Sequence, residues 1–252
     1  MKSLDELTKE DIKHVKIIVL DVDGVLVPRG TKIKQVGNRT CFETKKIKKR
    51  QIEQIKKLHK IGYKININSG RSLFMLKEMF RDILSFISLT YENGSATWSD
   101  GKVYQHVNSF REIKNVMDDL RKIKHRDIKG FEPKEFIITI HCKKRIGKIE
   151  NTVNKYKNLY WIWNDEAYDV GVKKIQTKAV GLRKVMKLFK LKRKNVLVSG
   201  DNYNDREMIK EAGISVSADR SRLIGDFYVH LNGKFLPADS LMQKIIHLGS
   251  RA

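Results

Sequence analysis

The sequence contains very little cysteine and very little proline. Its 252 residues include two cysteines, Cys41 and Cys142, which lie far apart and in no spacing typical of a metal site. Such sparse cysteine excludes a disulfide-rich secreted scaffold and is typical of proteins in a reducing intracellular compartment. The three prolines are also few for a chain with long disordered linkers.

Long hydrophobic runs are also missing. No apolar stretch approaches the ~20 residues that a helix needs to cross a bilayer. The first 16 residues are rich in charge and lack the apolar segment of a secretory signal. We therefore expect a cytoplasmic protein that does not enter a membrane.

Acidic residues are outnumbered by basic ones. The chain has 52 Lys and Arg against 29 Asp and Glu, which gives a net charge of +23, and such an excess is one feature of nucleic-acid-binding proteins. The excess is spread along the whole chain, however, and the many Ile and Asn residues beside Lys would also follow from coding bias in an AT-rich genome. Nucleic-acid binding is therefore kept as an alternative and is not the favoured interpretation.

Strand and helix patterns alternate over most of the chain. A continuous apolar run at 15–20 predicts a buried strand, and residues 46–61 place apolar side chains on one face of a helix. A second strand at 64–68, a helix at 72–84 and a third strand follow, and the pattern resumes from residue 178. This order predicts a parallel sheet with helices on both faces.

Between these two halves the pattern changes. A strong hairpin signal at Asp100-Gly101 is followed by helix, strand, helix and two further strands, which predicts a small unit with a mainly antiparallel sheet. The expected fold class is therefore α/β, with a doubly wound, Rossmann-like parallel sheet as the core and an inserted α+β cap domain. We expect the core to comprise residues 1–91 and 172–252, and the cap, residues 92–171, to determine substrate specificity.

Clusters of polar residues stand where three predicted strands end and where one predicted helix begins. In a doubly wound sheet the carboxyl ends of parallel strands form one edge, and ligands bind in the crevice there. We therefore expect these side chains to converge on one site. The residues concerned are Asp21, Asp23, Ser69, Gly70, Arg71, Lys178, Asp201, Asn204 and Asp205.

Four carboxylates in one crevice would repel one another without a cation among them. An all-oxygen ligand set with room for water suits Mg²⁺, which could bridge to a substrate phosphate. Ser69 and Lys178 would hold further phosphate oxygens, helped by backbone N–H groups around Gly70. One carboxylate could attack phosphorus while another transfers protons. Asp23 suits the second role because the two-residue period of an extended strand returns it to the side of Asp21.

These residues carry a resemblance to a known family. Four segments resemble, in order, the four motifs of the haloacid dehalogenase superfamily: "DVDGVL", "NSGR", Lys178 and "GDNYND". The insertion between the second and third motifs resembles the subgroup with a large cap, which includes sugar-phosphate phosphatases and phosphomannomutases. The segment "YENGS" is also similar to that subgroup, and the resemblance covers essentially the whole chain.

The resemblance implies a role for each acidic residue. Asp21 matches the nucleophile and a Mg²⁺ ligand, and Asp23 matches the general acid/base, whose main-chain carbonyl would also bind the metal. Asp201 matches the third metal ligand. Asp205 matches a carboxylate that binds the metal through water or supports the metal ligands from behind.

The resemblance also implies how phosphate is held. Ser69 and Lys178 match the phosphate-binding residues, and Asn204 is expected within reach of the phosphate. Lys173 and Lys174 lie close in sequence and remain alternatives to Lys178, which is preferred because it opens a helical pattern.

Together these features predict a Mg²⁺-dependent phosphohydrolase that acts on a small phosphorylated metabolite, such as a sugar phosphate. One alternative is a phosphomutase, which would need cap residues that grip a second phosphate, and the cap offers Arg111, Arg121, Lys143 and Arg145. The other alternative is a nucleic-acid or anionic-surface binder that uses the basic core. His141 and His106 are assigned no role. The sequence predicts neither the substrate nor the oligomeric state.

Overall fold

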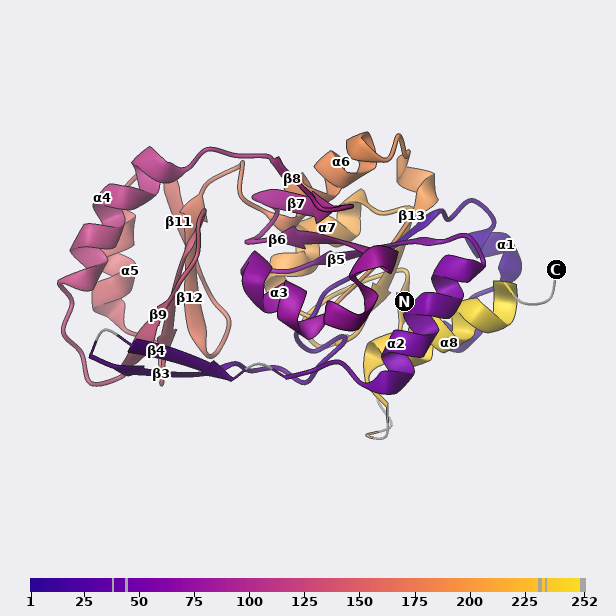
Figure 1. Ribbon diagram of the computed structural model, residues 1–252, viewed down its shortest axis with the longest axis horizontal. Helices are drawn as coiled ribbons and strands as arrows, with labels where there is room; N and C mark the ends of the chain where they lie inside the picture. The colour runs from indigo at the N-terminus through magenta and orange to yellow at the C-terminus, as the bar shows by residue number, and fades with distance from the viewer. Residues whose placement is uncertain (38, 44, 231–232, 234, 250–252) are drawn as a thin grey trace.

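The computed structural model describes residues 1–37, 39–43, 45–230, 233 and 235–249. A large, mostly parallel sheet with helices on both faces forms one lobe, and a smaller antiparallel sheet with two helices forms the other (Figure 1). The predicted fold class, an α/β core with an inserted α+β cap, is confirmed.

The large sheet has nine strands in the order β1-β15-β14-β13-β2-β5-β6-β7-β8. The first seven pair in parallel, and β7 and β8 are antiparallel to their neighbours. The strands are β1 (Lys2–Ser3), β2 (Ile17–Leu20), β5 (Lys64–Asn68), β6 (Ile87–Tyr91), β7 (Ala96–Ser99), β8 (Lys102–Gln105), β13 (Val196–Gly200), β14 (Ile214–Ser217) and β15 (Phe227–Tyr228).

Strand β2 lies inside this sheet and is buried on both faces. Ile18 and Leu20 pack into the apolar cluster under α2, α3 and α8, while Ile17 and Val19 pack under α6 and α7. A strand covered on both sides has no polar face, which explains the unbroken apolar run in the sequence. The helices are α1 (Lys9–Ile12), α2 (Lys49–Lys60), α3 (Leu73–Met79), α6 (Lys178–Leu188), α7 (Arg206–Glu211) and α8 (Pro237–Gly249), with short 3₁₀ helices at Leu4–Glu6, Arg81–Phe86, Arg193–Asn195 and Tyr203–Asp205.

The smaller lobe is built on a four-stranded antiparallel sheet in the order β11-β12-β10-β9. Its two helices cover the face that points away from the large sheet, and apolar residues of both helices pack onto the strands (Figure 1). The opposite face is turned toward the core. The elements are β9 (Ile128–Glu132), β10 (Ile138–Cys142), β11 (Leu159–Trp163), β12 (Ala167–Val172), α4 (Phe110–Arg121) and α5 (Gly147–Asn154).

The hairpin at Asp100-Gly101 forms, but in a different sheet from the one expected. Strand β7 pairs with β6, so β7 and β8 extend the large sheet and not the cap sheet. The chain reverses through Glu92, Asn93 and Gly94, whose φ angles of 48°, 54° and 83° are all positive. A hairpin signal fixes how two strands pair and leaves open which sheet they join. We therefore propose that the inserted unit begins after β8, at about residue 107, and not at residue 92.

A second hairpin links the lobes. Strands β3 (Lys32–Val36) and β4 (Arg39–Glu43) pair with each other, and this ribbon lies along the cap sheet (Figure 1). The backbone N–H of Phe131 in β9 donates to Gln35 Oε1 at 3.4 Å. The ribbon follows β2 in the chain and contacts β9, the edge strand of the cap sheet.

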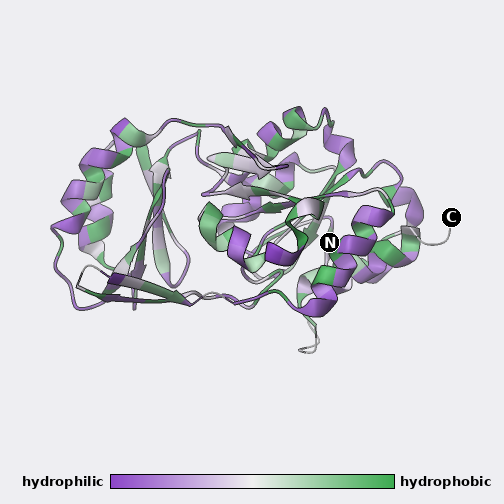
Figure 2. Ribbon diagram, in the orientation of Figure 1, coloured by the Kyte–Doolittle hydropathy of each residue, from purple (hydrophilic) through white to green (hydrophobic). Residues whose placement is uncertain are grey.

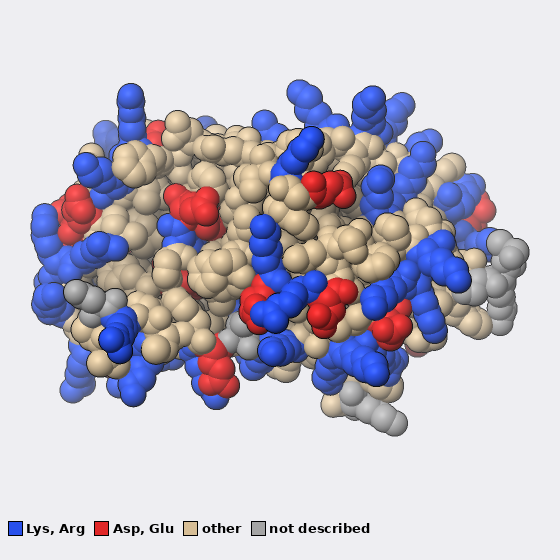
Figure 3. All heavy atoms as spheres, viewed as in Figure 1, with Lys and Arg blue, Asp and Glu red and all other residues tan. Residues whose placement is uncertain are grey.

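The distribution of polar residues fits a globular protein with buried sheets. Hydrophilic and hydrophobic residues alternate around the covering helices in Figure 2, as expected of helices that each bury one face. Lys and Arg side chains are scattered over both lobes on the face shown in Figure 3. Within the described part of the chain, no helix combines the length and the apolar character needed to cross a membrane.

His106, just after β8, should make folding stability depend on pH. Its ring bonds to Thr97 Oγ1 at 2.9 Å, and burial, aided by the charge of Lys184, lowers the pKa of His106 to about 4. In the unfolded chain the His106 ring takes up a proton near pH 6.5, whereas in the folded chain it does so only near pH 4. The contribution of neutral His106 to folding stability is therefore complete above pH 6.5 and is lost as the pH falls toward 4. Urea unfolding at pH 7 and pH 5 should show a smaller loss of stability for His106→Gln than for the wild type. His14→Gln, at an exposed site, should keep the wild-type dependence.

Candidate active site

Three strands place a polar side chain at the carboxyl edge of the large sheet. Asp21 follows β2, Ser69 follows β5 and Asp201 follows β13, and these strands are neighbours. Sheet hydrogen bonding continues past the strand ends, since Asp21 N–H donates to Ser199 O and Ser69 N–H donates to Thr90 O, both at 3.0 Å. The backbone at this edge is therefore fixed, and so are the positions from which the side chains project.

Lys178 supplies a buried positive charge at this edge. It is the first residue of α6, and the side chain of Thr177 caps that helix by accepting a bond from Val180 N–H. The Lys178 ammonium lies 2.8 Å from Asp21 Oδ1 and 2.7 Å from Asp205 Oδ1. Burial opposes the charged form, but the two carboxylates outweigh it and raise the pKa of Lys178. The structure thus brings Lys178, not Lys173 or Lys174, between the acids.

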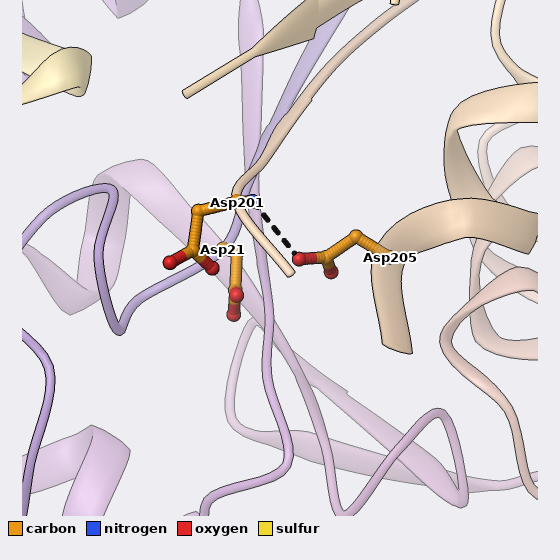
Figure 4. Close-up of side chains that lie close together, drawn as sticks. All are labelled: Asp21, Asp201 and Asp205. Carbon is orange, nitrogen blue, oxygen red and sulfur yellow. Dashed lines mark hydrogen bonds between the residues drawn. The ribbon is translucent and has the colours of Figure 1, made fainter. Parts of the chain in front are cut away.

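Asp205 holds the loop after β13 in place. One of its carboxylate oxygens, Oδ2, accepts the backbone N–H of Asp201 at 3.1 Å (Figure 4). The same oxygen accepts the N–H of Asn202 at 3.1 Å, and the other oxygen pairs with Lys178. The side chain lies directly against Gly200, where an added Cβ would come within 2.6 Å of Asp205 Cβ. Since both oxygens are engaged, Asp205 orients the neighbouring groups and is poorly placed to give an oxygen wholly to a metal.

Asp201 points into the same space as Asp21 (Figure 4). The guanidinium of Arg29 donates from Nε to Asp201 Oδ2 at 2.5 Å, and also reaches Asp219 Oδ2 at 3.0 Å. Gly24 allows the close approach, because it has a φ of +76° and a Cβ there would lie 1.9 Å from Asp201 Oδ2. The turn after β2 therefore depends on glycine for two separate reasons.

Asp23 is held by a two-point contact. Arg71 donates from Nε to Asp23 Oδ2 at 2.9 Å and from Nη2 to Oδ1 at 2.7 Å. Such a bidentate pair fixes the plane of the carboxylate as well as its position. Asp23 and Asp21 both line one cleft, as the strand period predicts, and the Asp23 side chain is 35% exposed there.

The acidic cluster is short of positive charge. Carboxylate oxygens of Asp21, Asp201 and Asp205 lie within 4.8 Å of one another, and all three residues are buried. Burial, followed by the charge of Asp205, raises the pKa of Asp21 well above its usual value and raises that of Asp201 to about 6. A divalent cation would relieve this repulsion, and an all-oxygen donor set suits Mg²⁺. The residues present therefore fit the expected metal.

The other predicted phosphate-binding residues lie around the same cleft. Ser69, Gly70 and Asn204 line it together with Lys178. Asn204 Oδ1 is buried and accepts no hydrogen bond from any residue that the structure describes, so this amide has a polar group to offer to a ligand. The cavity volume is ≈ 150 Å³, which is small beside the usual range of about 300–1,000 Å³ for ligand sites.

The cap supplies groups that the sequence interpretation assigned no role. Thr139 and His141 on β10, Asp169 on β12 and Glu132 at the end of β9 all line the cleft. Their positions at every second residue of otherwise apolar strands were a signal for one polar face. Lys134 also lines the cleft and donates to the Gly70 carbonyl at 2.8 Å.

Glu92, in the turn after β6, ties the cap to the core. Its carboxylate accepts the backbone N–H groups of Glu135, Phe136 and Ile137, the shortest at 2.7 Å. The same turn packs on the phosphate loop, since Glu92 N–H donates to Arg71 O at 3.1 Å. The role of Glu92 could not be read from sequence, because its partners are backbone groups of another lobe.

The sequence matches the haloacid dehalogenase-like hydrolase family over residues 18–170 and 122–222, which together span most of the chain. The chain belongs to this family. The resemblance predicted from the four motifs is confirmed, and the protein is an enzyme of a hydrolase family. A phosphoglycolate phosphatase of Metallosphaera sedula is similar to it, at 22% identity over 213 residues, covering 81% of this chain and 85% of the relative.

Solved structures of similar proteins have the same fold. A haloacid dehalogenase superfamily phosphatase from Bacteroides thetaiotaomicron aligns with a TM-score of 0.67 and 21% identity, covering 93% of this chain and 95% of that one. A protein related to trehalose-6-phosphate phosphatase aligns with a TM-score of 0.69 and 16% identity, covering 94% and 99%. A subclass IIB sugar phosphatase aligns with a TM-score of 0.63 and 18% identity, covering 93% and 99%.

Removing the buried ammonium should destabilise this family member severely. Lys178→Met leaves Asp21 and Asp205 buried without their shared partner, and losing one partner of a buried ion pair costs about 3–5 kcal/mol. Urea unfolding in the absence of divalent metal should show a loss of that size. Lys187→Met, an exposed position on the same helix, is the matched control and should unfold within about 0.5 kcal/mol of the wild type. Equal stability of the two variants would contradict the charge arrangement described here.

Proposed function

We propose that this hydrolase is a Mg²⁺-dependent phosphatase that removes phosphate from a small phosphorylated metabolite through an aspartyl-phosphate on Asp21. The observation that carries the proposal is the position of the Asp21 carboxylate. It is buried at the end of the central strand, with Lys178 on one side and Asp201 on the other. Asp21 thus lies beside a lysine and beside a second carboxylate that could bind a metal. Such a nucleophile is suited to attack a phosphate, because the lysine and the bound metal ion would both attract that phosphate.

Each step can be assigned to residues of this chain. An Asp21 carboxylate oxygen attacks phosphorus, and the bond from phosphorus to the leaving alcohol oxygen breaks. Asp23, in its protonated form, gives its proton to that oxygen. As a carboxylate it then takes a proton from the water that attacks phosphorus, the bond from phosphorus to the Asp21 oxygen breaks, and phosphate and the free Asp21 carboxylate are released. Arg71 orients Asp23 for this work. Lys178, Ser69, Asn204 and the N–H of Gly70 would hold the phosphoryl oxygens.

The metal would be held by carboxylates of Asp21 and Asp201 and by the main-chain carbonyl of Asp23. When bound, Mg²⁺ supplies positive charge that lets an anionic nucleophile approach an anionic phosphate. Asp205 would act from behind by fixing the Asp201 backbone and Lys178. Arg29 pairs with Asp201 in this structure. When the metal binds, Arg29 would either keep a hydrogen bond to the Asp201 carboxylate or move away from it.

The substrate class is supported by the shape of the site. The cap sheet faces the core cleft, and the small cavity favours a compact ester over a polymer. The relatives named above act on phosphoglycolate and on sugar phosphates, and a sugar phosphate or similar phosphoester remains the substrate that we propose. A cytoplasmic location also remains a prediction.

The two alternatives receive less support. The four cationic cap residues that a phosphomutase could use are all exposed, and none of them lines the cleft in the described structure: Arg111, Arg121, Lys143 and Arg145. A nucleic-acid binder would be expected to gather its basic residues into one patch or stripe. On the face in Figure 3 the basic side chains are instead scattered and interspersed with acidic ones.

Asp21→Asn should abolish hydrolysis of a generic aryl phosphate such as p-nitrophenyl phosphate. We expect a loss of roughly 10³-fold or more in kcat, as for other catalytic nucleophiles, because an amide cannot form the phosphoenzyme. EDTA should have a similar effect, reversed by Mg²⁺. The control is Asp118→Asn on the exposed face of α4, which should keep full activity. Undiminished turnover in Asp21→Asn or in EDTA would refute the proposal.

Gly24→Ala should weaken metal binding. The added methyl group would collide with Asp201 Oδ2, so the Asp201 side chain must move away from the cluster. The alanine would also have to adopt the backbone φ of +76° that glycine has here. The rise in melting temperature that Mg²⁺ gives the wild type should be lost. Gly37→Ala provides a matched control, because its φ of +57° is also unfavourable for alanine, while no described atom outside its chain neighbours lies within 4 Å of the added Cβ. A full Mg²⁺-dependent rise in Gly24→Ala would contradict the proposed metal site.

A further inference from the structure

We propose that the cap selects phosphate esters whose leaving alcohol carries no negative charge. The inference rests on the proposed function, because it concerns which ester enters the same cleft. The cap wall is defined here as Thr139 and the ionisable cap residues that line the cleft: Glu132, Lys134, His141, Asp165, Glu166 and Asp169.

The core side of the cleft has one acid more than cations before metal binds. Asp205 pairs with Lys178 behind the cleft and adds to the three acids that line it, so four acids stand against three permanent cations. The lining acids are Asp21, Asp23 and Asp201, and the cations are Arg29, Arg71 and Lys178. A divalent ion would turn this deficit into an excess of one positive charge, so the core side meets the charge of the phosphate only once the metal is bound, and the cap wall faces the leaving alcohol.

The cap wall itself carries a negative excess. Four carboxylates stand against a single lysine, Lys134. They are those of Glu132, Asp165, Glu166 and Asp169. The only titratable cation besides it in this wall is His141, whose Nε2 lies 3.0 Å from Glu132 Oε2. Even with the His141 ring protonated, four carboxylates exceed two cations, and three still do when Asp165 is set against its partner Arg222.

Lys134 is already occupied by protein groups and is poorly placed to bind a substrate carboxylate. An ammonium has three N–H donors, and this buried one donates to Gly70 O at 2.8 Å and to Thr139 Oγ1 at 2.6 Å. It also forms an ion pair with Glu132 Oε1 at 3.4 Å. Asp169 Oδ1 lies 3.8 Å away and adds further negative charge around it. Lys134 is thus neutralised by the cap and the phosphate loop.

Glu166 is the group in the cap wall that is ready for a ligand. Its carboxylate lies over Gly30 of the core, where an added Cβ would come within 2.9 Å of Glu166 Oε1. No described residue donates a hydrogen bond to this carboxylate or pairs with it. Asp165, beside it, is instead paired with Arg222 at 3.1 Å. Glu166 would therefore accept a bond from a hydroxyl or ammonium of the substrate and repel a carboxylate.

Two esters that differ in one group provide the test. Glycerol 3-phosphate has a hydroxymethyl group where 3-phosphoglycerate has a carboxylate, and phosphoethanolamine adds a cationic member. With Mg²⁺ present, kcat/KM should be at least about tenfold higher for glycerol 3-phosphate than for 3-phosphoglycerate, a difference of about 1.4 kcal/mol. Comparing kcat/KM for phosphoethanolamine with kcat/KM for glycerol 3-phosphate shows whether the cleft prefers a cationic or an uncharged leaving alcohol.

Glu166→Gln should narrow that preference, mainly by raising kcat/KM for 3-phosphoglycerate. Glu112→Gln, which makes the same change at an exposed position on the outer helix α4, should leave the ratio of the two kcat/KM values unchanged. An equal or reversed preference in the wild type, with metal-dependent hydrolysis intact, would overturn this inference and leave the phosphatase proposal standing. An unchanged ratio in Glu166→Gln would overturn the role of Glu166. Failure to hydrolyse any ester would overturn the proposed function and this inference with it.

Discussion

The ion pair that Lys178 makes with both Asp21 and Asp205 is the interaction on which the site depends. All three side chains are buried, and buried carboxylates remain ionised only when a cation lies beside them. The ammonium supplies one positive charge to a cluster of three acids, and Arg29 supplies a second from the cleft side. The remaining deficit is what favours a metal ion.

The fold brings these groups together through topology. The chain leaves β2 and forms β5 and β6 on one side, then returns after the cap to form β13 on the other side. The loops at the carboxyl ends of these strands therefore open away from β2 in two directions and leave a crevice above it. The cap is inserted between the halves, so its inner face lies over the crevice without interrupting the sheet that positions the acids.

Local sequence patterns were enough to predict the core side of this arrangement. Fully buried parallel strands read as unbroken apolar runs, and the polar residues that follow them stand out, which is why Asp21, Ser69 and Asp201 could be singled out and expected at one edge. The helix start at Lys178 could be placed in the same way. The structure brings these residues to one cleft, as expected, while their chemical roles remain proposals.

The parts that could not be predicted depend on contacts between distant segments. Strand β9 has no clear strand pattern in the sequence around Gly130. Strands β7 and β8 join the large sheet because the turn before β7 has three residues with positive φ angles. Arg29 and Lys134 are two among many basic residues, and only the three-dimensional structure shows that they reach Asp201 and Gly70. Because lysine and arginine are abundant in this chain, the sequence pattern did not single out Arg29 and Lys134 as residues of the site.

The central claim is that a divalent ion binds between Asp21 and Asp201, next to Lys178. Crystals grown with Mn²⁺ in place of Mg²⁺ would test it most directly, because manganese can be located by its anomalous scattering. The account predicts one strong peak per chain within coordination distance of both carboxylates. No peak there, or a peak bound elsewhere with Arg29 still occupying Asp201, would contradict it.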